Sequence, residues 1–187
     1  MKKSLALLII TVFITAGTSD DVFAGGKEES PTLEQTYSEI GYKTVEEAAK
    51  EFEEHFKQDV KLPLRVPPIP FSHQFGRFND LEDDINDSFD MDFINEDSPE
   101  NHYKIDIRPI NRKISINKKY FVNQYTLKNG KEATLINIAN SFDAIVFEIG
   151  PWQYMLSVDK RVSDIVTVEI LLDIANSIDY LSEDKRS

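Results

Sequence analysis

Residues 89–108 read FDMDFINEDSPENHYKIDIR, in which apolar and charged side chains alternate in two runs. Such alternation is typical of a strand with one buried face, so residues 89–93 and 103–108 predict two strands. The polar stretch 95–101 between them favours an antiparallel hairpin. One face of this hairpin is apolar, and the other carries Asp90, Asp92, Lys104 and Arg108. We expect these opposite charges to pair across the strands on a solvated face, at about 0.2 to 1 kcal/mol for each pair.

Further strands are predicted on the C-terminal side of this hairpin. The pair Asn129-Gly130 stands between two apolar runs, and Asn-Gly is the strongest short signal for a hairpin turn. Gly150-Pro151 predicts another turn, which is followed by a strand beginning at Trp152. The segments that read as strands or short edges are 114–116, 125–127, 133–138, 144–149 and 152–158.

Amphipathic helices are predicted before and after the strands. Thr44 and Glu47 form a capping-box pattern, and apolar residues at helical spacing follow it as far as Phe56. A second helical pattern runs over 170–181, with Thr167 or Ser163 as its N-cap. The proline-rich segment 60–78 is expected to be an extended, irregular connection. This order predicts an α+β domain, an antiparallel sheet of about six strands in hairpins packed by an N-terminal and a C-terminal helix.

The N-terminal residues have the pattern of a secretory signal peptide. Lys2 and Lys3 precede the apolar run 5–16, and Val22-Phe23-Ala24 resembles a cleavage site. The run is shorter than the ~20 residues that a spanning helix needs, so we expect no stable membrane insertion after cleavage. The expected organisation is a signal peptide over 1–24, a disordered leader over 25–41, a single α+β domain over 42–182 and a disordered tail over 183–187. The expected location is secreted, extracellular or in the cell-wall zone.

Charge and cysteine content exclude several classes of function. The chain of 187 residues has 33 acidic and 21 basic side chains and a net charge of -12, which argues against binding to nucleic acid. It has no cysteine, which excludes disulfides, thiolate metal sites and cysteine nucleophiles. A lipid-anchored signal is excluded for the same reason.

The acidic tract between Asn79 and Asn101 is the strongest candidate for metal binding. Extracellular calcium prefers carboxylate ligands, and the candidate residues are Asp80, Asp83, Asp84 and Asp87. An EF-hand that began at Asp80 would need Gly and Glu where the chain has Ile85 and Met91. We therefore favour charge pairing with the base-rich segment 104–131 over a metal site. The expectation is no cofactor, with calcium as the alternative.

Two motifs of the common hydrolases, HExxH and GxSxG, do not occur in the sequence, and the three histidines do not stand at metal-ligand spacing. Gly76, Gly130 and Gly150 are isolated and expected in turns, so no phosphate-binding loop is predicted. A candidate binding surface is formed by the aromatic residues Tyr120, Phe121 and Trp152. Aromatic residues that alternate along a strand are, however, more often part of the core. Because Tyr120 and Phe121 are adjacent, they must point to opposite faces of a strand.

Two groups of segments carry a resemblance to a known family. The first group is 60–63, 67–71 and 75–78, and the second is 127–133, 145–147, 152–157 and 174–178. Together they resemble a domain of unknown function in secreted proteins and lipoproteins of Bacillus-like Gram-positive bacteria, which also forms outward-facing parts of some anti-sigma and sporulation-associated membrane proteins. The resemblance covers roughly 45–181 and implies no catalytic residues. The hairpins and last helix are also similar to sandwich folds of the Mog1/PsbP type.

These observations predict a secreted, non-catalytic binding or regulatory module at the cell envelope. Its expected partner is a protein or peptide, and the chain itself is expected to be a monomer. A calcium-associated acidic extracellular domain is the alternative, and a cryptic hydrolase is the third hypothesis.

Overall fold

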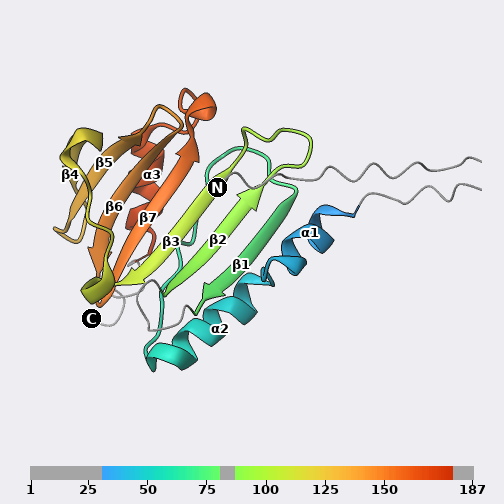
Figure 1. Ribbon diagram of the computed structural model, residues 1–187. Helices are drawn as coiled ribbons and strands as arrows, with labels where there is room; N and C mark the ends of the chain where they lie inside the picture. The colour runs from blue at the N-terminus through green and yellow to red at the C-terminus, as the bar shows by residue number, and fades with distance from the viewer. Residues whose placement is uncertain (1–30, 81–86, 179–187) are drawn as a thin grey trace, which may run out of the picture. The chain divides into compact units, whose positions relative to one another are not determined.

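The computed structural model describes residues 31–80 and 87–178 (Figure 1). The helices are α1 (Leu33–Glu39), α2 (Val45–Phe56) and α3 (Val168–Asn176), with short 3-10 turns η2 (Ile110–Arg112), η3 (Lys118–Tyr120) and η4 (Lys160–Val162). The strands are β1 (His73–Asn79), β2 (Ser88–Ile94), β3 (Tyr103–Pro109), β4 (Phe121–Thr126), β5 (Glu132–Ile138), β6 (Phe142–Ile149) and β7 (Trp152–Asp159). They form one sheet of seven strands in the order β1-β2-β3-β7-β6-β5-β4, and every pair is antiparallel. The predicted α+β class is confirmed.

Helices α2 and α3 pack on the same face of the sheet, and α3 lies behind the strands in the view of Figure 1. The predicted capping box at the start of α2 is present, because Thr44 accepts from the Glu47 amide and Glu47 accepts from the Thr44 amide. Phe52 of α2 is fully buried, with its ring 4.7 Å from that of Trp152 on β7. Thr167 is the N-cap of α3, one of the two residues predicted for that position.

Strand β1 lies inside the proline-rich segment that was expected to be irregular. His73–Asn79 carries bulky side chains on both faces, so it lacks the alternation that identifies a half-buried strand. Gly76 was predicted to lie in a turn, but it lies in strand β1 beneath α2. A Cβ atom on Gly76 would lie 2.8 Å from Cα of Val45 and 2.9 Å from the carbonyl oxygen of Thr44. The glycine therefore allows the helix backbone to approach the strand.

Two other expectations are wrong. Residues 25–41 were expected to be a disordered leader, but α1 forms at 33–39 with a capping box between Thr32 and Gln35. The ring of Tyr37 stacks on Phe75 of β1 at 4.4 Å, which anchors this short helix to the sheet. Residues 114–116 were expected to form a strand or an edge, but they are irregular and follow η2. The predicted signal peptide over 1–24, residues 25–30 of the expected leader and the expected tail over 183–187 lie outside the described residues.

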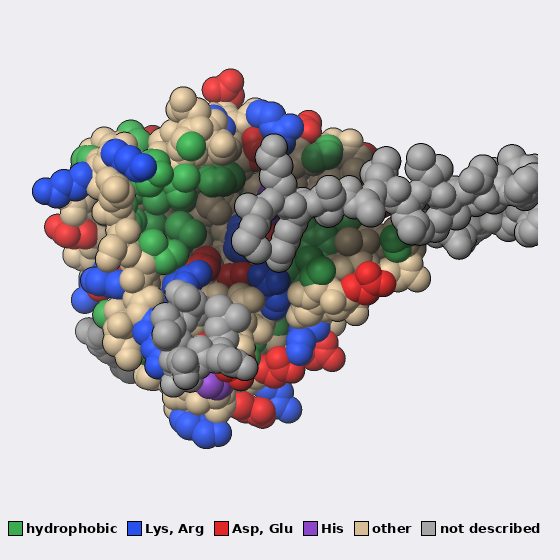
Figure 2. All heavy atoms as spheres, in the orientation of Figure 1, with side chains coloured by type: hydrophobic (Ala, Val, Ile, Leu, Met, Phe, Trp, Pro, Cys, Tyr) green, Lys and Arg blue, Asp and Glu red, His purple; other side chains and the backbone are tan. Residues whose placement is uncertain are grey.

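The second face of the sheet carries the charged side chains of the predicted hairpin. Asp90, Asp92 and Asp106 are only 4%, 4% and 5% exposed, so this face is not the solvated surface that the sequence predicted. Lys104 Nζ lies 3.1 Å from Asp90 and 3.9 Å from Asp92, which confirms the expected cross-strand pairing for that lysine. Arg108 instead pairs with Asp106 on its own strand, at 2.7 Å. Figure 2 looks onto this face and shows acidic and basic side chains together near its centre.

A small apolar cluster lies on the same face, beside the charged group. Ile136, Ala144 and Val146 are its buried members, and Tyr120 packs against them. Hydrophobic side chains gather there on the side of β5 and β6 in Figure 2. Among the described residues, no helix is long and apolar enough to span a membrane.

Candidate functional site

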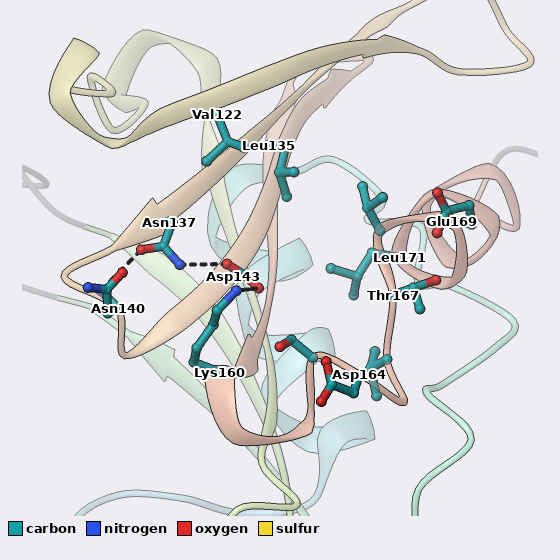
Figure 3. A pocket seen from close by; sticks show the side chains of 13 residues that line it. Val122, Leu135, Asn137, Asn140, Asp143, Lys160, Asp164, Thr167, Glu169 and Leu171 are labelled. Carbon is teal, nitrogen blue, oxygen red and sulfur yellow. Dashed lines mark hydrogen bonds and ion pairs between the residues drawn. The ribbon is translucent and has the colours of Figure 1, made fainter.

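A pocket of about 650 Å³ lies between the β5–β6 hairpin and the start of α3 (Figure 3). It exists because α3 covers only part of its face of the sheet. One wall of the pocket is the segment that runs from the end of β7 through η4 to the first turn of α3. The opposite wall is the end of the β5–β6 hairpin. Its volume is within the range of about 300–1,000 Å³ that is usual for ligand sites.

The pocket has an apolar part among mostly polar lining residues. Leu135 and Leu171 point into the space from the sheet and from α3. Val166 and Leu171 are almost fully buried, so the core of the domain forms the deepest part of the pocket. The apolar lining residues are Val122, Leu135, Val166, Val168 and Leu171. A side chain that entered here would leave water for an aliphatic surface.

The rim on the sheet side is held by hydrogen bonds to Asp143 of β6. Lys160 Nζ donates to Oδ2 of Asp143 at 2.7 Å, and Asn137 Nδ2 donates to Oδ1 at 2.6 Å. The backbone N–H of Asn140 donates to Asn137 Oδ1 at 3.1 Å. Both oxygens of Asp143 therefore have donors, and Asn137 is fixed in the orientation seen in Figure 3.

The rim on the helix side is acidic. Asp164 and Glu169 line it, and Lys160 is the one basic residue among the thirteen that line the pocket. Hydrogen bonding to the Thr167 hydroxyl and to the backbone keeps the pKa of Glu169 below its usual value. Because Lys160 is paired with Asp143, the mouth of the pocket has a negative charge that favours a cation.

The predicted aromatic surface is not one surface. Trp152 is 3% exposed, and its indole N–H donates to the Asp59 carbonyl at 2.9 Å beneath α2, so its assignment to a binding surface is corrected. Tyr120 is on the opposite side of the sheet, packed against the apolar cluster of β5 and β6. Phe121 is 51% exposed on the edge strand β4. Alternation along strand β7 put Trp152 in the core with Tyr154 and Leu156.

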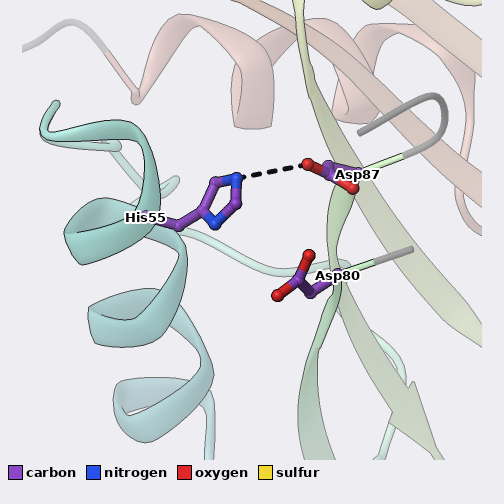
Figure 4. A group of neighbouring side chains, drawn as sticks. All are labelled: His55, Asp80 and Asp87. Carbon is purple, nitrogen blue, oxygen red and sulfur yellow. Dashed lines mark ion pairs between the residues drawn. The ribbon is translucent and has the colours of Figure 1, made fainter. Parts of the chain in front are cut away.

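The structure brings together two of the four predicted metal ligands. Asp80 follows β1 and Asp87 precedes β2, and the two lie beside His55 of α2 (Figure 4). Asp83 and Asp84 lie outside the described residues. His55 was not among the predicted ligands, because it is 25 residues or more from these aspartates and no spacing rule connects it with them.

The pocket, like the position of His55, was not predicted from the sequence. Its polar residues come from the β5–β6 hairpin, η4 and α3, and they form no continuous motif. Asn137, Asn140 and Asp143 stand close together in the sequence, but this composition is typical of any hairpin turn. Comparison with models of known protein families, with curated proteins and with solved structures found no match to this chain.

Proposed function

We propose that this chain is a secreted, non-catalytic binding module of the cell-envelope zone, and that the pocket beside α3 receives a short peptide segment. The segment has an apolar side chain next to a basic one. The observation that carries this proposal is the pocket itself, in which five aliphatic side chains lie beside the acidic Asp164 and Glu169.

The interior suits a side chain of the size of Leu or Ile. Burying such a side chain is worth about 1.5–3 kcal/mol. The apolar contact surface is offered by Val122, Leu135 and Val168 of β4, β5 and α3, and the buried Val166 and Leu171 support it from below. Because these residues are held in place by the fold, the pocket is formed before a ligand binds, and little ordering cost falls on the protein.

The mouth selects the charge of the ligand. Asp164 and Glu169 stand on the helix side, where a lysine or arginine next to the inserted side chain would lie. An exposed ion pair adds only about 0–1 kcal/mol, so these acids contribute selectivity and association rate more than affinity. An acidic or phosphorylated segment would be repelled.

The pocket chemistry supports binding over catalysis. Its hydroxyl side chains are Ser163 and Thr167, and no histidine is among the thirteen lining residues that could act as a base for them. A nucleophilic mechanism needs such a base within hydrogen-bond reach. The N-terminal residues support export, because a basic start, an apolar run and Val22-Phe23-Ala24 are arranged as in a signal peptide.

Titration with two model peptides tests the binding proposal. Acetylated and amidated Arg-Leu-Arg is expected to bind, with amide chemical-shift changes confined to residues around Leu135, Val166 and Leu171. Glu-Leu-Glu is expected not to bind. The double variant Asp164→Asn, Glu169→Gln should weaken Arg-Leu-Arg binding about 5- to 10-fold, whereas Asp173→Asn, an exposed acid of α3 outside the pocket, should not. Equal binding of both peptides, or shift changes elsewhere, would overturn the proposal.

Export is tested separately. Production of the full-length chain in a Gram-positive host should release into the medium a protein whose N-terminal sequence begins at Gly25. Retention of the uncleaved chain in the cells would contradict the proposed location without bearing on the pocket.

A further inference from the structure

We propose that His55, Asp80 and Asp87 form a binding site for a divalent transition-metal ion of the zinc type. The three side chains each offer one ligand atom, and these atoms all lie within 4.8 Å of one another. Figure 4 shows the imidazole and the two carboxylates turned toward a common space. This site lies under α2 and is independent of the pocket beside α3.

The strand register explains why the two aspartates meet. Strands β1 and β2 are antiparallel, and their last registered pair is Asn79 opposite Ser88. Asp80 and Asp87 are the next residues outward on each chain. Because side chains alternate between faces, this pair points to the same face as Phe78 and Phe89, which is the face that α2 covers.

Helix α2 supplies the third ligand. His55 belongs to the last turn of α2 and extends from the helix toward Asp80 and Asp87. Its ring lies 4.7 Å from the ring of Phe56 and 5.1 Å from that of Phe78. These contacts with two aromatic rings fix the plane of the imidazole, so that Nε2 is directed at the carboxylates.

The distances fit a shared ion. His55 Nε2 lies 3.3 Å from Oδ2 of Asp87. Two ligands at about 2.0–2.2 Å from a tetrahedral zinc ion are separated by roughly 3.3–3.6 Å. The spacing between His55 and Asp87 is therefore already that of two ligands on one metal, and the exposed Asp80 has a ligand atom within 4.8 Å of both.

The donor set selects the kind of ion. Calcium takes six to eight oxygen ligands, whereas zinc is bound by four ligands that commonly include imidazole and carboxylate. One nitrogen and two carboxylates match the second pattern, and water would fill the fourth position. The site thus differs in both its ligands and its metal from the calcium site that the sequence left open as the alternative.

Among the described residues, Arg112 competes with a metal for Asp87. Its Nη1 lies 3.3 Å from the same Oδ2 of Asp87 that faces His55, and Asp87 is fully buried. The guanidinium stabilises the buried carboxylate when no metal is bound, and it repels a cation that approaches. Affinity for the metal is consequently lower than the ligands alone would give, and removal of the arginine charge should raise it.

Calorimetric titration of the full-length protein with Zn²⁺ tests the proposal. One ion is expected to bind per chain, and Co²⁺ in its place should give visible d–d absorption bands that report nitrogen and oxygen donors. His55→Asn and Asp80→Asn should each weaken Zn²⁺ binding by about tenfold or more. Asp80 is exposed, so its variant retains the fold.

Matched controls separate this site from chance binding by surface histidines. His73 and His102 each lie 2.9 Å from one carboxylate, Glu34 and Asp92 respectively. His73→Gln and His102→Gln should leave Zn²⁺ affinity unchanged, and Arg112→Gln should raise it. The proposal is overturned if wild-type protein binds no Zn²⁺ at 100-fold excess, if Asp80→Asn binds as wild type does, or if Ca²⁺ competes on equal terms.

Discussion

Asp90 and Asp106 face each other directly across β2 and β3, with both carboxyl groups buried. Oδ1 of Asp90 has no hydrogen-bond partner, although Arg77, Asn79 and Lys104 all lie within 3.5 Å of Oδ2. Burial raises the pKa of Asp106 to about 6, and the charge of Asp90 adds to this effect against the opposing contact of Arg108. A proton on Asp106 would give Oδ1 of Asp90 the donor that it lacks.

This pair makes stability depend on pH in a defined direction. The pKa of Asp106 is raised from 3.8 to about 6 in the folded protein, so the folded state holds the proton more tightly than the unfolded chain. Its stabilising contribution is present below pH 4 and is lost as the pH rises through 6. A shift of this size corresponds to about 3 kcal/mol.

The variant Asp106→Asn should remove the loss of stability that wild type shows as the pH rises through 6. An amide keeps the shape of the side chain and does not titrate. It can donate to Asp90 Oδ1 while its oxygen keeps one of the two hydrogen bonds that Arg108 donates to Asp106. We expect the difference in free energy of unfolding, Asp106→Asn minus wild type, to grow by about 2–3 kcal/mol as the pH rises from 4 to 7. Urea denaturation of both proteins at half-unit intervals measures this difference, and a difference independent of pH would contradict the assignment.

Asp92 should give the opposite slope. Burial alone would raise its pKa, but the hydrogen bond with His102, the charge of Lys104 and the Tyr42 hydroxyl together hold the pKa of Asp92 below its usual value. Its contribution is therefore present above pH 4 and is lost as the pH falls further. Asp92→Asn should cost about 2 kcal/mol at pH 7 and less at pH 3.

Tyr42→Phe is the matched control for Asp92, since it removes one donor and leaves the carboxylate. The Tyr42 hydroxyl lies 2.7 Å from Asp92 Oδ2. The loss should be about 1–2 kcal/mol at pH 7. The same urea series serves for both variants, and a cost for Asp92→Asn that grows toward acid pH would show that the sign is wrong.

The elements that the sequence predicted correctly are those with local signals. The capping box of Thr44 and Glu47, the Asn129-Gly130 turn and the alternation of 89–93 each act within a few residues, and each is present in the structure. Strand β1 was missed because its strand character depends on pairing with β2 and on Gly76 under α2, neither of which is visible locally.

The candidate sites were harder to predict for the same reason. The zinc-type site joins His55 to Asp80 and Asp87 through tertiary packing of α2 on the β1–β2 hairpin. The burial of Asp90 and Asp106 contradicts the ordinary rule that charged residues on alternating strands face water. Charge composition identified the acidic tract, but it did not distinguish buried carboxylates from exposed ones.

Gly76→Ala should be strongly destabilising. The added methyl group would meet backbone atoms of Val45 and Thr44 at under 3.0 Å, and a helix backbone cannot move aside as a flexible side chain can. We expect a loss of about 2–4 kcal/mol, in the range of severe overpacking. Thermal unfolding followed by circular dichroism measures it.

The matched control is Gly130→Asn, at a glycine with a positive φ of 79° and open space around its Cβ position. Asparagine tolerates this left-handed conformation, so a cost below about 1 kcal/mol is expected. If Gly76→Ala were as mild as this control, the close approach of α2 to β1 would not hold.

Trp152 should report on the core and not on ligand binding. It is the one tryptophan of the chain, and its ring packs against Phe52 and Phe56 at 4.7 and 5.5 Å. Its fluorescence in the native protein should be blue-shifted and poorly quenched by acrylamide, because water and quencher cannot reach the ring.

Trp152→Phe should cost about 1–3 kcal/mol, since the smaller ring leaves a cavity and the Asp59 carbonyl loses its donor. Phe121→Ser on the exposed edge of β4 is the control and should change the free energy of unfolding by less than about 0.5 kcal/mol. Strong quenching of native Trp152, or equal costs for the two substitutions, would show that Trp152 is exposed and would contradict its place in the core.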